Sequence, residues 1–540
     1  MTNKILSFVR TLKLLLRSAI ELFEKILDVF VNRPAHLLRL PREKSFSLQE
    51  NCYGKAELKK HPGRSGFYLL ENNLDAFLAR YELIEHSEKT LDLQYYYFHG
   101  DTSGRLISRA LIEAADRNVR VRILLDDIET LGADESVSTL NAHPGIEIRL
   151  FNPFFFRGLL RYIEFITDLS RVGRRMHNKA IIADNCQAII GGRNIGDNYF
   201  SANPEFFFVD IDLLSMGPIV KKISASFDEY WNSRWAVPVE NLYPVPDKKT
   251  ASKKLKRYLQ RYVQSVKQVD FEQALKQSSL QINKGLAGLT YIWSDAKLFY
   301  DAPTKIDSDN EAEKKYLKTD LREIVSSARH SVTLISPYFV PGTQGLKWLL
   351  EMRKNGIEIC VYTNSLAATD VVAVHSGYAR YRSQLLAAGV SLYELKPSAY
   401  VMGRNRLKVL RPGSRSSLHA KTVIIDNERV FIGSPNLDPR SSNLNTEMGL
   451  LVNNKVLARQ VLDLFSGDMT RKNSYHLMLE GQHKNSAAGV GASASVAKSR
   501  IVWSSEEGEG ERQYYSDPQA GFWRKLSVIV YRLLPVEAFL

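Results

Sequence analysis

Two short stretches of the chain carry the same spacing of an imidazole, an ammonium and a carboxylate. In "HNKAIIAD" these groups belong to His177, Lys179 and Asp184. The second copy, "HAKTVIID", begins 242 residues later and has His419, Lys421 and Asp426. An imidazole can attack an electrophile or carry a proton, and a neighbouring lysine can neutralise an anion. Two such sets brought together would form a site for a tetrahedral anion, and phosphate is the natural candidate.

Each motif is followed by a turn of small residues, "GGRN" at 191–194 and "GSPN" at 433–436. These turns offer backbone N–H groups, and Asn194 and Asn436 add side-chain donors, so we expect both asparagines to bind the phosphoryl oxygens. On a strand, the histidine and the lysine two positions later share one face. Asp184 and Asp426 then end their strands, where we expect them to bond turn backbone in a structural role.

A single match to this pattern is weak, because a histidine beside a lysine on a strand is usually structural. The rest of the chain is duplicated at nearly the same interval. Apolar strands predicted at 91–98 and 332–339 place Phe98 and Phe339 241 residues apart, and Gly145 and Gly389 are 244 apart in matching turns. Strands alternate with helices in both copies. We therefore predict an α/β fold of two similar halves, each a mostly parallel sheet flanked by helices, packed about a pseudo-twofold axis.

The remaining segments divide the 540-residue chain further. We expect an amphipathic N-terminal helix over 1–33, the first half over 50–236, a connector over 237–316 and the second half over 317–480. A low-complexity stretch predicts a flexible loop over 481–515, and an apolar tail predicts a helix within 516–540. The N-terminal helix could lie in a membrane interface or dock on the protein's own core.

The net charge of +14 and the pI of about 9.4 favour a polyanionic partner. Nucleic acid and an anionic membrane surface both fit, and so does a general role of charge in solubility. No apolar run approaches the roughly 20 residues of a membrane-spanning helix.

The duplicated motif resembles the phospholipase D superfamily, and the match extends from about residue 63 to 451 and again at the C-terminus. In detail the chain is similar to bacterial cardiolipin synthases of phospholipase D type, of their C subfamily. The stretches that carry this likeness are "LDLQYYYF", "GGRNIGDNYF", "NSLAATDVVAVHSGYARYR", "LHAKTVIIDNERVFIGSPNLDPRSSNLNTE" and "LLPVEAFL".

The resemblance implies a mechanism through a covalent phosphohistidine, with no metal and no cofactor. His177 would be the nucleophile and His419 the general acid and base. In the family a carboxylate after each motif orients its histidine, which here assigns Asp210 to the first half and Glu447 to the second. Asp212 shares a strand face with Asp210 and is the alternative.

The resemblance also implies a phosphatidyltransferase that forms cardiolipin from phosphatidylglycerol, with phosphatidylglycerol or phosphatidylethanolamine as the donor. Hydrolysis to phosphatidic acid is the alternative, followed by a nuclease and then by a non-enzymatic membrane-binding module. We expect a monomer whose halves mimic a dimer, bound peripherally to the cytoplasmic face of a bacterial inner membrane.

Overall fold

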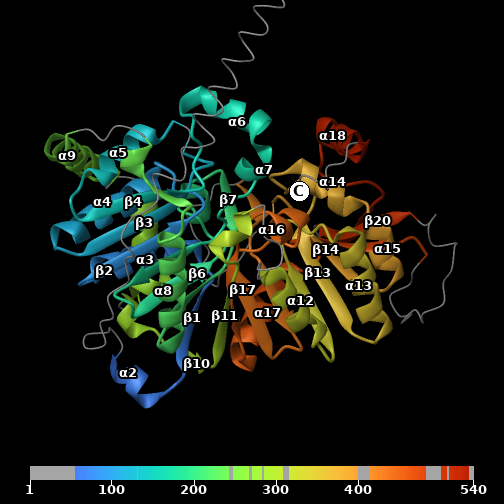
Figure 1. Cartoon of the computed structure of the whole chain (residues 1–540). Coiled ribbons are helices and arrows are strands. Elements are labelled where there is room, and N and C mark those ends of the chain that lie inside the picture. The colour runs from blue at the N-terminus through green and yellow to red at the C-terminus, as the bar shows by residue number, and fades with distance from the viewer. Residues whose placement is uncertain are drawn as a thin grey trace, which may run out of the picture.

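The fold is known from a computed structural model (Figure 1). It describes residues 55–130, 132–242, 247–266, 270–282, 285–307, 316–398, 414–481, 500–507 and 510–533. The helix predicted over 1–33 lies outside these residues. Residues 404–411, the basic stretch "RNRLKVLR" that precedes the second motif, lie outside them as well.

Among the described residues, each half is built on one large sheet. The first has the strand order β10-β1-β8-β6-β5-β2-β3-β4-β9, and the second β11-β18-β17-β16-β12-β13-β14-β19-β20-β21. The strands of the first sheet are β1 (Ser65–Leu70), β2 (Thr90–Tyr95), β3 (Arg120–Asp126), β4 (Ile146–Phe151), β5 (Ala180–Ala183), β6 (Gln187–Gly191), β8 (Asp212–Met216), β9 (Ala236–Pro238) and β10 (Ile292–Ser294). Those of the second are β11 (Ala296–Tyr300), β12 (Ser331–Ile335), β13 (Glu358–Asn364), β14 (Ser391–Leu395), β16 (Thr422–Ile425), β17 (Arg429–Gly433), β18 (Met448–Val452), β19 (Ser474–Leu479), β20 (Ile501–Glu507) and β21 (Gly510–Tyr514).

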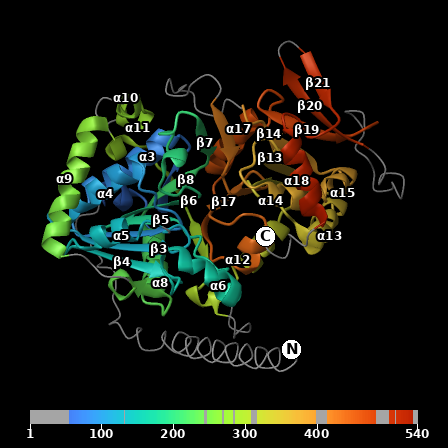
Figure 2. The ribbon, with the colours of Figure 1, turned by 90° about the horizontal axis from the view of Figure 1, so that it is seen from above.

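The helices flank these sheets (Figure 2). Those of the first half and the connector are α2 (Lys55–Lys60), α3 (Asn73–Glu85), α4 (Thr102–Asp116), α5 (Asp134–Asn141), α6 (Arg161–Thr167), α7 (Leu169–Val172), α8 (Pro218–Trp231), α9 (Lys248–Val266), α10 (Asp270–Lys276) and α11 (Ser279–Ile282). Those of the second half are α12 (Leu317–Ser326), α13 (Gly342–Lys354), α14 (Val372–Ala379), α15 (Arg382–Ala387), α16 (Pro439–Asn443), α17 (Lys455–Asp468) and α18 (Phe522–Leu533).

The duplicated α/β fold is confirmed. The six strands β8-β6-β5-β2-β3-β4 repeat as β18-β17-β16-β12-β13-β14. Isolated bridges repeat as well, because Phe98 pairs with Ile195 in the first half and Phe339 with Leu437 in the second. The repeat interval found in the sequence is therefore a repeat of strand pairing.

The expectation of mostly parallel sheets is wrong, because both sheets are mixed. Only β2-β3-β4 and β12-β13-β14 pair in parallel, through the crossover connections that parallel strands need. After each motif the chain instead turns straight back, and β5 pairs with β6 and β16 with β17 as antiparallel hairpins. Asp184 and Asn185 have φ of 52° and 55°, and the matching Asp426 and Asn427 have 54° and 55°. The dipeptide Asp-Asn was the hairpin signal, since these two residues tolerate left-handed backbone.

The flexible loop predicted over 481–515 is also partly wrong. Strands β20 and β21 occupy most of 501–514 and extend the second sheet beyond β19. Trp503 is 5% exposed and its indole donates to Glu394 Oε2 over 3.1 Å, so this edge is anchored in the core.

The halves share a central core. One cluster of buried apolar side chains joins strands of both sheets, with Ile182 and Leu213 from the first half and Ile424 and Leu450 from the second. The other two clusters lie within the separate halves. Burial of apolar surface therefore holds the halves together, at about 25 cal/mol per Å².

Candidate active site

Backbone pairing between the halves brings the two histidines together. Phe206–Val209 (β7) of the first half and Arg415–Leu418 (β15) of the second form a parallel pair that leads into His419, whose N–H donates to Val209 O over 2.7 Å. In the same way the N–H of His177 donates to Thr446 O over 2.9 Å. Each motif is thus joined to the other half just before that half's carboxylate, because Asp210 follows Val209 and Glu447 follows Thr446.

The histidines and carboxylates are consequently paired across the halves. Nδ1 of His177 lies 2.9 and 3.0 Å from the Glu447 carboxylate oxygens, and Nδ1 of His419 lies 2.6 Å from Asp210 Oδ2. The assignment of each carboxylate to the histidine of its own half is therefore wrong. Backbone pairing between the halves, rather than proximity in the sequence, determines which carboxylate lies beside each histidine. A carboxylate that accepts the Nδ1 proton leaves Nε2 of the ring as the free nucleophile or proton carrier.

Asp210, rather than Asp212, is the carboxylate beside a histidine. Asp212 Oδ2 instead accepts from Arg80 over 2.9 Å and from Arg193 over 3.0 Å, in a fully buried cluster. The Asp212 side chain thus neutralises two buried arginines in the core of the first half.

Small differences distinguish the two carboxylates. Ser434 donates to Glu447 Oε2 over 2.5 Å, whereas the matching position in the first half is Gly192. A Cβ at Gly192 would overlap the Asp210 carboxylate, so this residue has to be glycine. Burial raises the pKa of Glu447 to about 7, against the lowering effect of Lys179, and burial also raises the pKa of Asp210.

The lysines complete a concentrated basic cluster. Nζ of Lys179 donates to His177 O over 2.6 Å, and Lys421 makes the equivalent bond to His419 O. Burial, together with the charges of both lysines, lowers the pKa of each histidine well below its usual value. Burial likewise lowers the pKa of Lys421 to about 8. A bound anion would oppose the effect of the lysine charges on the histidines and favour the charged form of the lysines, so the site is suited to a phosphate group.

The asparagines lie beside this cluster in different settings. Asn194 accepts from Tyr97 N over 3.2 Å and donates to Tyr199 Oη over 2.9 Å. Asn436 is buried, and its side-chain oxygen accepts no hydrogen bond from the described part of the chain.

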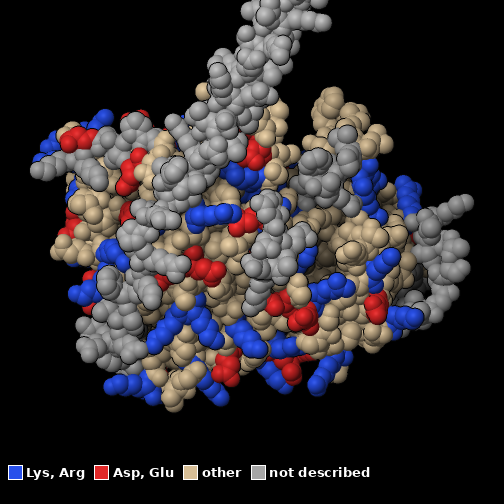
Figure 3. Space-filling model, viewed as in Figure 1, with Lys and Arg blue, Asp and Glu red and all other residues tan. Residues whose placement is uncertain are grey.

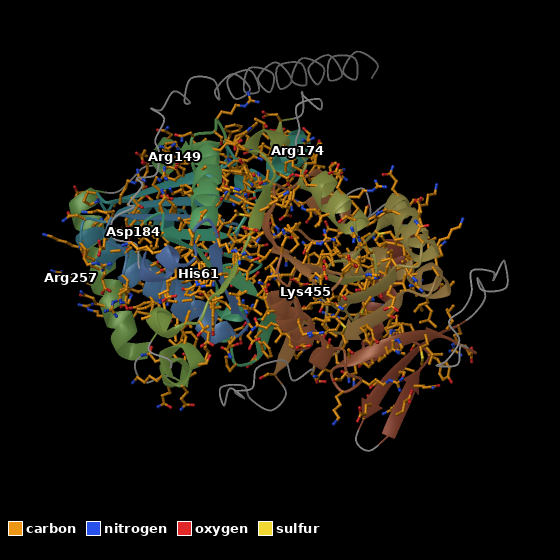
Figure 4. The ribbon with its side chains drawn as sticks, turned by 90° about the horizontal axis from the view of Figure 1, so that it is seen from below. His61, Arg149, Arg174, Asp184, Arg257 and Lys455 are labelled. Carbon is orange, nitrogen blue, oxygen red and sulfur yellow. The ribbon has the colours of Figure 1, made fainter. Side chains whose placement is uncertain are left out.

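The motif aspartates lie away from the histidines. Asp184 accepts from the backbone N–H groups of residues 88–90, and Asp426 from those of 329–331. Figure 4 places Asp184 on the side of the first half that faces away from the second. Both carboxylates cap the turn that precedes β2 or β12, as expected for a structural role.

Sequence reasoning missed the aromatic walls of the site. Tyr96 stands edge-on to the His177 ring with centroids 4.9 Å apart, and Tyr199 stands edge-on to His419 at 5.1 Å. The sequence predicts Tyr96 within a buried strand over 91–98, but β2 ends at Tyr95. Tyr96 therefore follows a strand end at the edge of the sheet where the two motifs meet, and this position could have indicated a role in the site.

The crossed pairs predict the effect of neutralising one carboxylate. Glu447→Gln should lower kcat by about 10³–10⁴-fold, as when a carboxylate that fixes a catalytic histidine's tautomer is lost. Because burial raises the pKa of Glu447 to about 7, wild-type kcat/KM, which reports the free enzyme, should rise with pH through that value as the carboxylate ionises, and the variant should lack this limb. Glu428→Gln, an exposed change, is the control.

Imidazole NMR separates crossed from uncrossed pairing. Glu447→Gln should shift the Nδ1 resonance of His177, and Asp210→Asn that of His419. The opposite assignment would contradict the crossed arrangement.

Known proteins share both the sequence and the fold. The family described as "Cardiolipin synthase, PLD-like domain" matches residues 81–231 and 321–469. Cardiolipin synthase C of Escherichia coli K12 is 39% identical over 486 residues, covering 88% of this chain and 97% of that protein. The major cardiolipin synthase of Bacillus subtilis is 24% identical over 421 residues, 76% of this chain and 71% of its own. The crystal structure of phosphatidylserine synthase from Haemophilus influenzae has a TM-score of 0.51 at 13% identity, covering 78% of this chain and 91% of that one, which supports the fold.

The family match falls once on each half and spans more than half of the 540 residues. Both matched ranges include a histidine motif and the carboxylate that follows it. The chain therefore belongs to the cardiolipin synthase family of phospholipase D-like enzymes.

Proposed function

We propose that the protein is a phosphatidyltransferase that forms cardiolipin by passing a phosphatidyl group through a phosphohistidine to phosphatidylglycerol. The observation that carries this proposal is the pairing of two buried histidines, each with a carboxylate of the other half, beside the buried lysines Lys179 and Lys421. Family membership adds the phospholipid substrate class, since the relatives are named cardiolipin synthases.

In the first step, Nε2 of His177 attacks phosphorus and the bond to the donor's alcohol breaks. His419, protonated on Nε2, gives that proton to the leaving alkoxide. Glu447 holds the Nδ1 proton of His177 and stabilises the positive charge that the ring gains on forming the N–P bond. Asp210 does the same for His419 while it is an imidazolium.

In the second step, the roles of His419 reverse. Its neutral Nε2 takes the proton of the primary hydroxyl of phosphatidylglycerol, whose oxygen attacks the phosphohistidine and frees His177. Lys179, Lys421, Asn194 and Asn436 are assigned to the phosphoryl oxygens. His177 is 7% and His419 8% exposed, and this burial favours transfer over hydrolysis because it restricts water.

We further propose peripheral binding to a membrane. No helix among the described residues is long and apolar enough to span a bilayer. Large apolar side chains are nevertheless exposed on two helical segments, with Leu160, Tyr162, Ile163, Ile166 and Leu169 in and beside α6, and Phe522, Trp523, Leu526, Ile529, Val530 and Leu533 on α18. Both segments lie on the upper side of the molecule in Figure 1, and the α18 segment stands out in tan in Figure 3. Apolar patches of this kind mark interaction surfaces, and tryptophan favours membrane interfaces.

The proposed reaction is tested with the purified protein in detergent and labelled phosphatidylglycerol, with and without phosphatidylethanolamine. Cardiolipin should form, and the released headgroup identifies the donor. His177→Ala and His419→Ala should abolish the product. Phosphatidic acid without cardiolipin would make the protein a hydrolase, and no lipid product at all would contradict the proposal.

The proposed membrane surface is tested by adding charge to it. Ile166→Glu combined with Ile529→Glu should weaken binding to phosphatidylglycerol vesicles by at least about tenfold, since a buried isoleucine is worth about 1.5–3 kcal/mol. Val456→Glu places the same charge at an exposed valine on α17, in the lower part of the molecule in Figure 1, and should leave binding unchanged. Equal binding by all variants would rule out α6 and α18 as the docking surface.

A further inference from the structure

The second half contains a cavity that the proposed reaction does not use. Its volume is about 490 Å³, within the range of roughly 300–1,000 Å³ typical of small-ligand sites. Three helices contribute lining residues: α12, the first two turns of α13, and α16. Apolar side chains from the helices and the sheet form its interior, including Leu321, Leu334, Trp348 and Val423.

The corresponding place in the first half is filled. There α10 packs on α3, which is the counterpart of α12 because it precedes β2 as α12 precedes β12. Phe77 of α3 stands edge-on to Phe271 of α10 and to Phe200, in both cases with centroids 5.4 Å apart. Tyr81 stacks on Phe77 at 6.1 Å. These four rings fill the groove of the first half that corresponds to the cavity, and we call Phe77, Tyr81 and Phe200 the plug residues.

The second half carries different residues at the plug positions. At the repeat interval of 241 or 242 residues, Phe77 corresponds to Lys318, Tyr81 to Arg322 and Phe200 to Ser442. All three of these second-half residues line the cavity. Two large rings are therefore replaced by exposed cations and the third by a small hydroxyl, which leaves the groove open and its mouth basic.

The mouth has a further feature that suits an anion. Residues 342–345, the first turn of the 13-residue helix α13, line the cavity, and the N-cap Pro341 makes no side-chain capping bond. The positive end of this helix therefore adds to Lys318 and Arg322. A ligand with an apolar chain and an anionic head would match both parts of the cavity.

The cavity also adjoins the active site. Asn436, assigned above to the phosphoryl group, lines it and has a buried side-chain oxygen without a partner among the described residues. Asp438, two residues on, lines it as well and interacts electrostatically with Lys421. An occupant would thus contact the loop that carries Asn436.

We infer that this cavity binds one acyl chain of an anionic phospholipid, with the charged head at the basic mouth. The inference rests on the proposed lipid function and adds a binding site to it. It explains why one half keeps its groove open while the other, with the same fold, closes it. In the first half the corresponding groove is occupied by α10 of the connector.

The first half supplies the design of the test. Ser442→Phe restores one plug residue without removing a cation from the mouth, and Lys347→Phe, on the exposed side of α13 outside the cavity, is the control. Each buried methylene is worth about fourfold in affinity. Ser442→Phe should therefore lower kcat/KM for dioleoyl phosphatidylglycerol by at least about tenfold, leave kcat/KM for the dihexanoyl lipid within about twofold, and differ from the control. Equal losses with both lipids, or no loss with either, would overturn the inference.

A binding measurement separates this inference from the proposed reaction. In the inactive His177→Ala background, phosphatidylglycerol with brominated chains should quench the fluorescence of Trp348, measured as the difference from the additional Trp348→Phe change. Ser442→Phe should lower the lipid affinity obtained from this quenching by at least about tenfold, and Lys347→Phe should leave that affinity unchanged. Absence of a Trp348 component would overturn the cavity site even if cardiolipin is formed. Its presence would support the site even if no lipid product is made.

Discussion

The exchange of backbone hydrogen bonds between the halves is the constraint on which the active site depends. Because β15 pairs with β7 and His177 bonds to Thr446, each histidine enters the site beside the other half's carboxylate. Neither half holds a complete histidine–carboxylate pair by itself. Removing one partner of such a buried pair leaves a polar group without its hydrogen-bond partner, at a cost of about 1–3 kcal/mol. The histidine–carboxylate pairs therefore form only when the two halves pack together.

Within this shared frame, the halves have diverged where their functions differ. Gly192 leaves room for the Asp210 carboxylate, while Ser434 at the matching place bonds to Glu447. Phe77 and Phe200 close one groove against α10, while Lys318 and Ser442 leave the other open. A duplicated fold thus keeps the reacting groups symmetric and varies the surroundings that select and position a substrate.

Much of this architecture could be predicted from the sequence because a repeat is visible without knowing any contact. The interval between His177 and His419 predicted two like halves, and the two histidines lie close enough to interact electrostatically at one site. The partners of these histidines could not be predicted, since strand exchange between the halves leaves no mark on the spacing of Asp210 and Glu447. The mixed sheets were missed for a different reason. The Asp-Asn hairpins at 184–185 and 426–427 are local turns, and the strand–helix alternation elsewhere outweighed them.

The most direct test of the account is to identify the residue that becomes covalently modified. The enzyme would be mixed with phosphatidylglycerol labelled in its phosphate, quenched within milliseconds in denaturant at mildly basic pH, which preserves both the N–P bond and the acyl esters, then digested and examined by mass spectrometry. A phosphatidyl group on the peptide that contains His177, and none in His177→Ala, is the predicted result. Label on His419 would reverse the roles of the two histidines. Product formation without any histidine adduct would contradict the two-step mechanism itself.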